Sequence, residues 1–179
     1  REHDTFFGQG IVAHVALADP MSAGLRTLLN EEAVKAGHRV HNGGTYVNMD
    51  GPAFSTRAES ETNRKLGFDI IGMTNLPEAK LAREAELCYA TLALSTDYDC
   101  WREEEEAVTV DAVVAVLKRN VSLAKEVVRR AAQLIAKLPP RSCGCARATE
   151  YAVMTHDIAP RDYERMKLII GRHIPPPTK

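Results

Sequence analysis

An apolar run leads directly into two spaced carboxylates in the stretch CYATLALSTDYDCW, residues 88–101. The first seven residues form a short apolar run that is followed by polar residues, which is typical of a buried strand. Asp97 and Asp99 then stand at the carboxyl end of that strand, where ligands bind in open α/β sheets. Because residues two apart in an extended chain point the same way, both carboxylates can face one small molecule. The alternative is a strand-to-loop turn whose aspartates are merely solvated.

Outward from this stretch, sheet-like and helical patterns alternate along the chain. Strand, helix and strand in this order favour an α/β fold in which crossover helices cover a sheet. We therefore expect one domain over residues 1–179, with a helical region at 139–179 after Pro139 and Pro140 end a long helix. The predicted extended segments are 10–17, 39–49, 68–72 and 88–96, and the predicted helices are 21–36, 55–65 with Ser55 as N-cap, 77–86, 110–138, 146–154 and 160–170.

The composition sets ordinary bounds on function. The chain has 179 residues, 45% of them hydrophobic, with 23 basic and 24 acidic side chains. This near balance of charge argues against nucleic acid or an anionic membrane as partner. No apolar run is long enough to cross a bilayer, and the first residues do not form a signal peptide. The chain does not begin with Met, so we expect a fragment or a processed chain.

Four ordered motifs resemble the S-methyl-5'-thioadenosine phosphorylase family. They are GTYV at 44–47, GPAFSTRAES at 51–60, GMTNLPE at 72–78 and TDYDCW at 96–101. The resemblance covers residues 1 to about 138 and implies the C-terminal portion of an α/β fold, a central mixed β-sheet or distorted barrel flanked by helices. It also implies phosphorolysis of methylthioadenosine to adenine and 5-methylthioribose 1-phosphate in purine and methionine salvage. Inorganic phosphate is then the co-substrate, and no cofactor or metal is expected.

The resemblance assigns the chemistry of base departure to the TDYDCW motif. Asp97 is expected to be catalytic by sharing a proton with purine N7, Asp99 to accept from the exocyclic amine, and Tyr98 to bind substrate beside them. Negative charge spreads onto the purine as the ribose becomes oxocarbenium-like, so an acid at N7 stabilises the transition state. Such an acid needs a pKa above the ordinary aspartate value of about 3.9, which a dry pocket supplies. Relatives that prefer 6-oxopurines carry an amide at this position, which favours adenine here.

The remaining motifs match contacts to the ribose, the phosphate and the base. Met73 is expected to meet the ribose hydroxyls through its backbone N–H, and the Thr74 hydroxyl to bind phosphate. Phe54 is expected to stack on the base, although core packing is the alternative for both Phe54 and Met73. Gly72 replaces an asparagine found in some members. Four positions match residues linked to substrate specificity: Ser55, Val110, Val113 and Val114.

His14 matches a histidine that reaches the methylthio end of a neighbouring subunit's site. The resemblance therefore implies a homotrimer or a dimer of trimers, whereas a lone histidine in a strand is more often structural. The family's glycine-rich phosphate loop, its Arg-His pair and a second phosphate-contacting threonine all precede the matched region. We therefore expect a companion N-terminal segment, or a chain that is inactive alone, in the cytoplasm.

The cysteines leave three alternatives open. Cys143 and Cys145 flank Gly144 in a C-x-C pair, which suits a metal half-site, a strained redox-active disulfide or two ordinary thiols. The four cysteines offer no second half-site at zinc spacing. Similar C-G-C sequences in some microbial members of the family form disulfides, so we expect reduced or reversibly oxidised thiols here. Cys88 and Cys100 are expected to be packing residues.

Two other functions compete with methylthioadenosine phosphorolysis. One is a related activity of the same family, such as a purine nucleoside or methylthioinosine phosphorylase or a hydrolase. The other is a non-catalytic chain that binds nucleosides. Activity on inosine and methylthioinosine, and its dependence on phosphate, separates the first alternative; tight binding without adenine release identifies the second.

Overall fold

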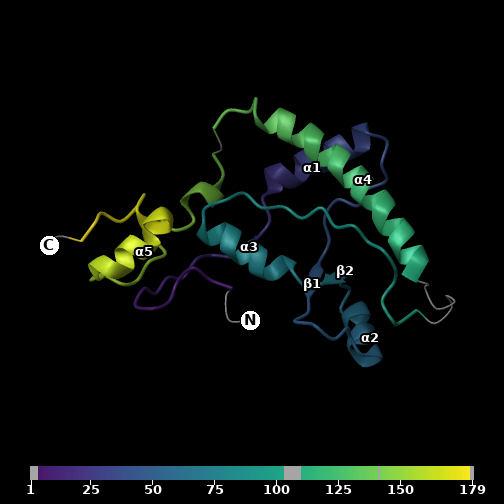
Figure 1. The fold of residues 1–179 in the computed structure, drawn as a ribbon, viewed down its shortest axis with the longest axis horizontal. Helices are drawn as coiled ribbons and strands as arrows, with labels where there is room; N and C mark the ends of the chain where they lie inside the picture. Colours follow the sequence, from purple (N-terminus) through teal and green to yellow (C-terminus); the bar gives the residue numbers. More distant parts are fainter. Residues whose placement is uncertain (1–3, 103–109, 141, 178–179) are drawn as a thin grey trace. The chain divides into compact units, whose positions relative to one another are not determined.

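The computed structural model describes residues 4–102, 110–140 and 142–177, which form two compact units (Figure 1). The first unit comprises Arg1–Leu25, Asn75–Ala90 and Pro139–Lys179, and the second comprises Arg26–Thr74 and Thr91–Leu138. The elements are α1 (Ala23–Lys35), β1 (Tyr46–Asn48), α2 (Arg57–Lys65), β2 (Ile70–Gly72), α3 (Asn75–Glu84), α4 (Val110–Ile135), the 3₁₀ helix η1 (Gly144–Arg147) and α5 (Pro160–Ile170). None of the described helices is both long and apolar enough to cross a membrane.

The sheet of the described residues is a parallel pair in the second unit. β1 and β2 pair in the register Tyr46–Ile70, Val47–Ile71 and Asn48–Gly72. The neighbouring strand leaves little room at Gly72, because a Cβ added there would lie 1.9 Å from the Tyr46 hydroxyl, which would have to move.

α2 begins one residue later than predicted, because Thr56 rather than Ser55 is its N-cap. The Thr56 hydroxyl accepts from the backbone N–H of Glu59 at 3.2 Å, and the Glu59 carboxylate accepts from the backbone N–H of Thr56 at 2.7 Å. This reciprocal capping box satisfies two N–H groups that the first helical turn leaves without partners. The helix start next to the 51–55 loop is therefore held locally.

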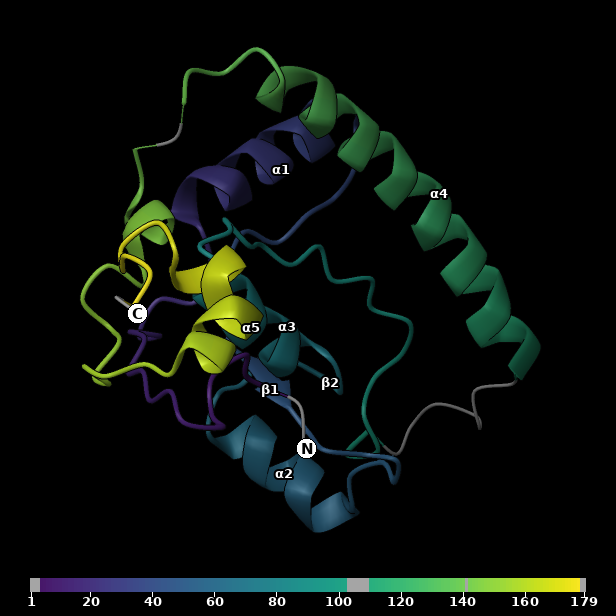
Figure 2. The same cartoon turned by 60° about the vertical axis from the view of Figure 1, so that its left-hand side comes forward.

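α1 and α4 pack together in the second unit, and Figures 1 and 2 show α1 along the C-terminal half of α4. Val127 and Ala131 of α4 are buried, and Arg130 Nε donates to the buried Glu32 of α1 at 3.1 Å. A hydrogen bond from Lys35 lowers the pKa of Glu32; burial acts against this shift, and Arg130 adds to it. Paired in this way, the carboxylate is retained inside the packing of the two helices.

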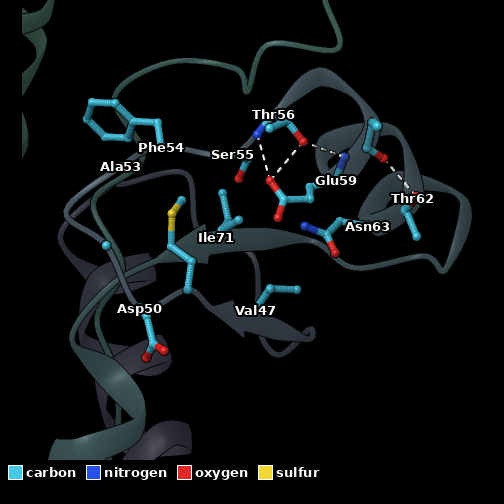
Figure 3. Close-up of a pocket in the computed structure, with 13 residues that line it drawn as sticks. Val47, Asp50, Ala53, Phe54, Ser55, Thr56, Glu59, Thr62, Asn63 and Ile71 are labelled. Carbon is cyan, nitrogen blue, oxygen red and sulfur yellow. Dashed lines mark hydrogen bonds between the residues drawn. The ribbon is translucent and has the colours of Figure 1, made fainter. Parts of the chain in front are cut away.

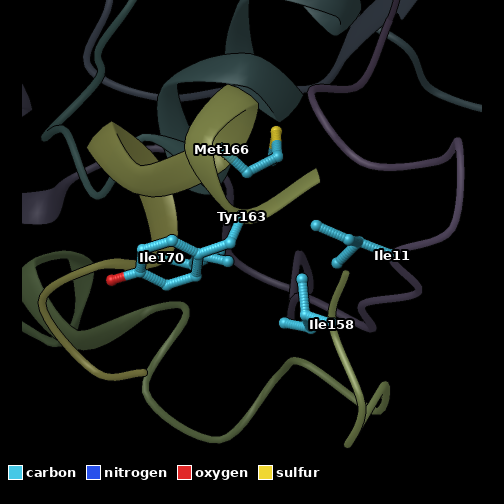
Figure 4. Close-up of a cluster of buried hydrophobic side chains, with 5 residues drawn as sticks. All are labelled: Ile11, Ile158, Tyr163, Met166 and Ile170. Carbon is cyan, nitrogen blue, oxygen red and sulfur yellow. The ribbon is translucent and has the colours of Figure 1, made fainter. Parts of the chain in front are cut away.

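The core of the first unit joins the N-terminal segment to α5 (Figure 4). Its buried side chains are Ile11, Ile158, Tyr163, Met166 and Ile170. α5 has the predicted bounds, with Pro160 in its first turn, where its missing N–H costs nothing. The prediction of a strand at 10–17 is wrong: Ala13 forms a single antiparallel bridge with Val153, and pairing does not continue on either side.

Two further predictions, the strand at 88–96 and the helix at 146–154, also fail. Residues 88–96 are extended but form no ladder among the described strands: the Tyr89 carbonyl accepts from the Ser22 N–H at 2.7 Å, and the Ser95 carbonyl from Asn120 Nδ2 at 2.8 Å. The helix predicted at 146–154 is reduced to η1 and turns. There, Glu86 accepts the Thr149 N–H at 3.1 Å, which removes that donor from helical bonding.

Candidate nucleoside site

The second unit brings the 51–60 and 96–101 motifs together at one corner. Cys100 Sγ donates to the Ser55 carbonyl at 3.7 Å, and Arg57 Nη1 donates to the Cys100 carbonyl at 2.9 Å. Two turns further along α2, the Arg64 guanidinium lies 4.0 Å from the centroid of the Trp101 ring. Such a cation–π contact adds about 0.5–2 kcal/mol, depending on its exposure. α2 thus holds the TDYDCW loop against the loop that precedes the helix.

The two carboxylates predicted to contact the base are oriented by their nearest neighbours in sequence. Asp97 Oδ1 accepts from the Thr96 hydroxyl at 2.5 Å, and Asp99 Oδ1 accepts from the backbone N–H of Cys100 at 2.8 Å. Since a carboxylate has about four lone-pair positions, each retains capacity for a ligand. Asp97 is exposed, so the dry pocket predicted around it is not formed by the residues that the structure describes.

Tyr98 is held between two partners in the same loop. Its ring meets the edge of Trp101 at a centroid distance of 5.7 Å and an interplanar angle of 77°. The Arg102 guanidinium lies 4.1 Å from the centroid of the Tyr98 ring. Edge-to-face pairs of this kind contribute about 0.5–1.5 kcal/mol beyond buried area. The aromatic contacts therefore stiffen the segment that carries both aspartates.

A pocket of about 710 Å³ opens beside this corner, between the 51–55 loop, α2 and the sheet (Figure 3). Its size lies in the range of small-molecule sites. Phe54 stands at one end, away from Asn63, and is 83% exposed, so the alternative of a core phenylalanine is wrong. The full lining is Val47, Met49, Asp50, Gly51, Ala53, Phe54, Ser55, Thr56, Ala58, Glu59, Thr62, Asn63 and Ile71. The predicted residues Phe54 and Ser55 line it, whereas Asp97 and Asp99 do not.

Met73 lies against the loop that borders this pocket. A Cβ added to Gly51, whose φ is +66°, would lie 2.8 Å from Met73 Sδ. The Met73 side chain is half-buried, so it packs as the alternative suggested. Its predicted ribose contact uses the backbone N–H and is compatible with that packing. Thr74 follows as an exposed residue directly before α3.

The other predicted site residues lie on different elements. Val113 is half-buried and Val114 exposed near the start of α4; Val110 begins that helix, but its side chain lies outside the described part of the chain. His14 belongs to the first unit, where its side chain is exposed and its backbone N–H donates to the Ala152 carbonyl at 2.9 Å. The corner contacts given above involve neither Val113 nor Val114.

Two residues that hold the corner were missed by the sequence analysis. Arg57 and Arg64 are seven positions apart on α2, and seven residues return an α-helix almost to the same face. Both side chains contact the TDYDCW loop, which contains the chain's single tryptophan. That i, i+7 spacing of guanidinium groups is the signal that could have identified them.

Comparison with known proteins places these residues in context. The phosphorylase superfamily model matches residues 1–133. S-methyl-5'-thioadenosine phosphorylase of Geobacter sulfurreducens is 52% identical over 173 residues, covering 96% of this chain and 60% of that protein. The corresponding Koribacter versatilis protein is 52% identical over 172 residues, covering 94% and 58%. The chain thus spans about 60% of the length of these relatives.

Solved structures agree with the sequence comparison. A methylthioadenosine phosphorylase from an antarctic soil metagenomic library superposes with a TM-score of 0.85 and 43% identity, over 93% of this chain and 59% of that one. Methylthioadenosine phosphorylase from Schistosoma mansoni in complex with adenine gives a TM-score of 0.70 and 34% identity, over 76% and 54%.

Proposed function

The chain belongs to the phosphorylase superfamily, and its α/β elements are a portion of that fold, so we propose that it contributes to phosphorolysis of S-methyl-5'-thioadenosine. In this reaction phosphate forms a bond to ribose C1', the bond from C1' to N9 breaks, and adenine leaves with the electron pair. The products are adenine and 5-methylthioribose 1-phosphate. The observation that carries the proposal is the corner at which α2 holds the TDYDCW loop beside the exposed Phe54.

The corner suits an aminopurine leaving group. Phe54 offers an exposed ring face for stacking, and base–aromatic stacking contributes about 1–3 kcal/mol in other systems. Asp97 then holds the proton shared with N7, and Asp99 accepts from the exocyclic amine. A base stacked at this corner excludes water from the loop, which strengthens its hydrogen bonds to the two carboxyl groups. Tyr98, fixed by Trp101 and Arg102, maintains the spacing of the two carboxyl groups.

The remaining roles in the proposal concern the ribose, the phosphate and assembly. The Met73 backbone meets the ribose and Thr74 contributes one hydroxyl to phosphate. A phosphate dianion usually takes several donors, so we infer that a companion N-terminal segment supplies the others. Its support is the length of the relatives, of which this chain covers about 60%. The two units then form one nucleoside phosphorylase domain.

The proposal extends to a cytoplasmic trimer, or a dimer of trimers, that serves purine and methionine salvage. In this assembly His14 reaches the methylthio group in a neighbouring subunit's site. The specificity positions Ser55, Val110, Val113 and Val114 then select the 5'-substituent. Of these four positions, Ser55 lines the pocket beside the corner, whereas the described side chains of Val113 and Val114 do not.

The test is adenine release from methylthioadenosine in saturating phosphate, measured with residues 1–179 alone and with the companion segment added. We expect little release alone and restoration on addition. With both present, Asp97→Asn should slow release at least tenfold, about 1.4 kcal/mol of lost transition-state stabilisation, and shift preference toward 6-oxopurine nucleosides.

The matched control is Asp111→Asn, since Asp111 is exposed on the first turn of α4. This variant should release adenine at the unmodified rate. Equal rates for Asp97→Asn and Asp111→Asn would overturn the role of Asp97. Full activity from residues 1–179 alone would overturn the proposed location of the phosphate site.

A further inference from the structure

Three cysteine sulphur atoms meet in the first unit, and none of them belongs to a residue of the proposed function. Cys88 follows α3, whereas Cys143 and Cys145 stand at the start of η1. The three Sγ atoms all lie within 4.8 Å of one another, and those of Cys88 and Cys143 are 3.2 Å apart. The sequence offers the Cys143–Cys145 pair no second half-site. The fold adds a third sulphur to this pair from Cys88, which the sequence analysis expected only to be a packing residue.

The spacing of these atoms fits a small tetrahedral ion. A zinc–thiolate bond is about 2.3 Å long, so sulphur ligands of one tetrahedral zinc lie about 3.8 Å apart. The separations at the cluster, from 3.2 Å to within 4.8 Å, bracket that value. The three sulphur atoms therefore lie close to the spacing that one tetrahedral ion requires.

The cluster is partly enclosed by the first unit. Cys145 is only 6% exposed, while Cys88 and Cys143 are half-buried, which leaves one side open for entry of an ion.

Arg83 of α3 lies near the cluster, and its Nε is buried with no hydrogen-bond partner among the residues that the structure describes. Its Nη2 donates to the Asp19 carbonyl. Three thiolates with one Zn²⁺ carry a net charge of −1, and a positive side chain nearby offsets part of it.

We propose that Cys88, Cys143 and Cys145 bind one zinc ion. Thiolates are soft ligands and select zinc or copper(I) over magnesium or calcium. Three protein ligands leave one tetrahedral position for water or another small ligand. Binding replaces the thiol protons by the metal, with release of up to three protons, and no electrons are transferred. The ion joins the chain after α3 to the C-terminal region, so it stabilises the first unit.

The experiment uses the full chain, reduced and freed of metal under anaerobic conditions, with cobalt(II) as a spectroscopic probe. We expect one equivalent to bind with thiolate charge-transfer bands and the intense visible bands of tetrahedral cobalt, and zinc to displace it. Cys88→Ser and Cys143→Ser should each weaken cobalt affinity at least tenfold. Cys100→Ser, in the second unit, is the matched control and should bind as the unmodified chain does.

Folding and metal loss are separated by two further measurements. Far-UV circular dichroism of each metal-free variant reports folding, and Cys88→Ser removes a half-buried rather than a buried thiol. Zinc should raise the Tm of the unmodified chain but not of Cys88→Ser. Arg83→Gln should weaken cobalt affinity, and Arg83→Lys should weaken it less.

Several results would overturn the proposal. One is a reduced, folded chain that shows no thiolate–cobalt bands. Another is equal affinity in the Cys88→Ser and Cys100→Ser variants, which would indicate adventitious binding. A third is mass spectrometry of the protein, purified under reducing conditions, that shows a disulfide within the cluster and no bound metal. Failure here would leave the proposed phosphorolysis untouched, because the assays share no residue.

Discussion

Replacing Glu86 with glutamine tests whether one buried carboxylate anchors the C-terminal region of the first unit. Glu86 is 5% exposed, and its φ of +56° is unusual for a residue other than glycine. Its Oε1 accepts from the N–H and hydroxyl of Thr149 at 3.1 and 2.9 Å and lies 2.7 Å from His173 Nε2. Its Oε2 accepts from Arg172 Nη1 at 3.0 Å. A left-handed glutamate with this many partners indicates that tertiary contacts outweigh local strain.

The expected loss in free energy of unfolding follows from the interactions that glutamine keeps at position 86 and from those that it loses. The amide oxygen still accepts from Thr149, but the charge facing Arg172 and His173 is gone. A hydrogen bond to a charged group contributes about 1.5–3 kcal/mol and a neutral one about 0.5–1.5 kcal/mol. Because the Arg172 side chain is 64% exposed, its share is reduced by solvent. We expect a loss of about 2 kcal/mol, or about 4–8 °C in Tm for a chain of this size.

The destabilisation caused by Glu86→Gln should become smaller as the pH falls. Burial raises the pKa of Glu86, but hydrogen bonds from Thr149 and His173 together outweigh it, so the pKa lies below its ordinary value of 4.5. A carboxylate with a lowered folded-state pKa stabilises the protein above the unfolded pKa and loses that contribution as the pH falls through the folded pKa. The stability difference between the unmodified chain and Glu86→Gln should therefore be largest near neutral pH and shrink below about pH 4.5.

The assay is urea unfolding of both proteins at neutral pH and in steps into the acid range. The control is Glu150→Gln, one residue from Thr149, because Glu150 pairs with the exposed Arg147 and should change stability far less. Equal losses for Glu86→Gln and Glu150→Gln at neutral pH, or a difference that persists unchanged into acid, would refute the reasoning.

Three other substitutions test the fold. Gly72→Ala must displace the Tyr46 hydroxyl and should cost about 1–3 kcal/mol by urea unfolding; on a Tyr46→Leu background the cost should fall, and an unchanged cost would exclude the hydroxyl as its cause. Ile11→Ala opens a cavity in the first core and should cost about 2–5 kcal/mol, whereas Ile135→Ala, at an exposed position, should cost much less; equal costs would contradict the described core. Thr56→Ala removes the N-cap of α2 and should cost about 1 kcal/mol, with less helical circular dichroism; no change would show that the capping box is dispensable.

The sequence predicts elements whose signals are local. α5 has the predicted bounds because Pro160 and the apolar spacing that follows it act within one helix. α4 starts at the predicted residue for the same reason, although it ends at Ile135 rather than 138. The strands expected at 10–17 and 88–96 fail because a ladder needs a partner, which no local pattern specifies. The helix expected at 146–154 fails because a glutamate more than 60 positions earlier takes the Thr149 N–H.

The same distinction between local sequence signals and long-range contacts applies to the candidate site. The resemblance predicts site roles for Phe54, Asp97 and Asp99, and the structure brings the two motifs that contain these residues to one corner. The sulphur that Cys88 adds to the cysteine cluster comes from a residue distant in sequence, so the spacing of the C-x-C pair could not predict it. The spacing of Arg57 and Arg64 predicts a shared helix face, but only the fold places the TDYDCW loop against that face.

The burial of Ile11 against α5 has a consequence for the order of events on the ribosome. The side chains that cover Ile11 belong to residues 158–170, about 150–160 positions later in the chain. At roughly 5–20 residues per second, they emerge about 8–30 s after Ile11 itself. During that interval Ile11 lacks the side chains that cover it in the folded unit. The first unit is therefore completed only after residues 158–170 have emerged, and nascent-chain chaperones have access to Ile11 throughout that time.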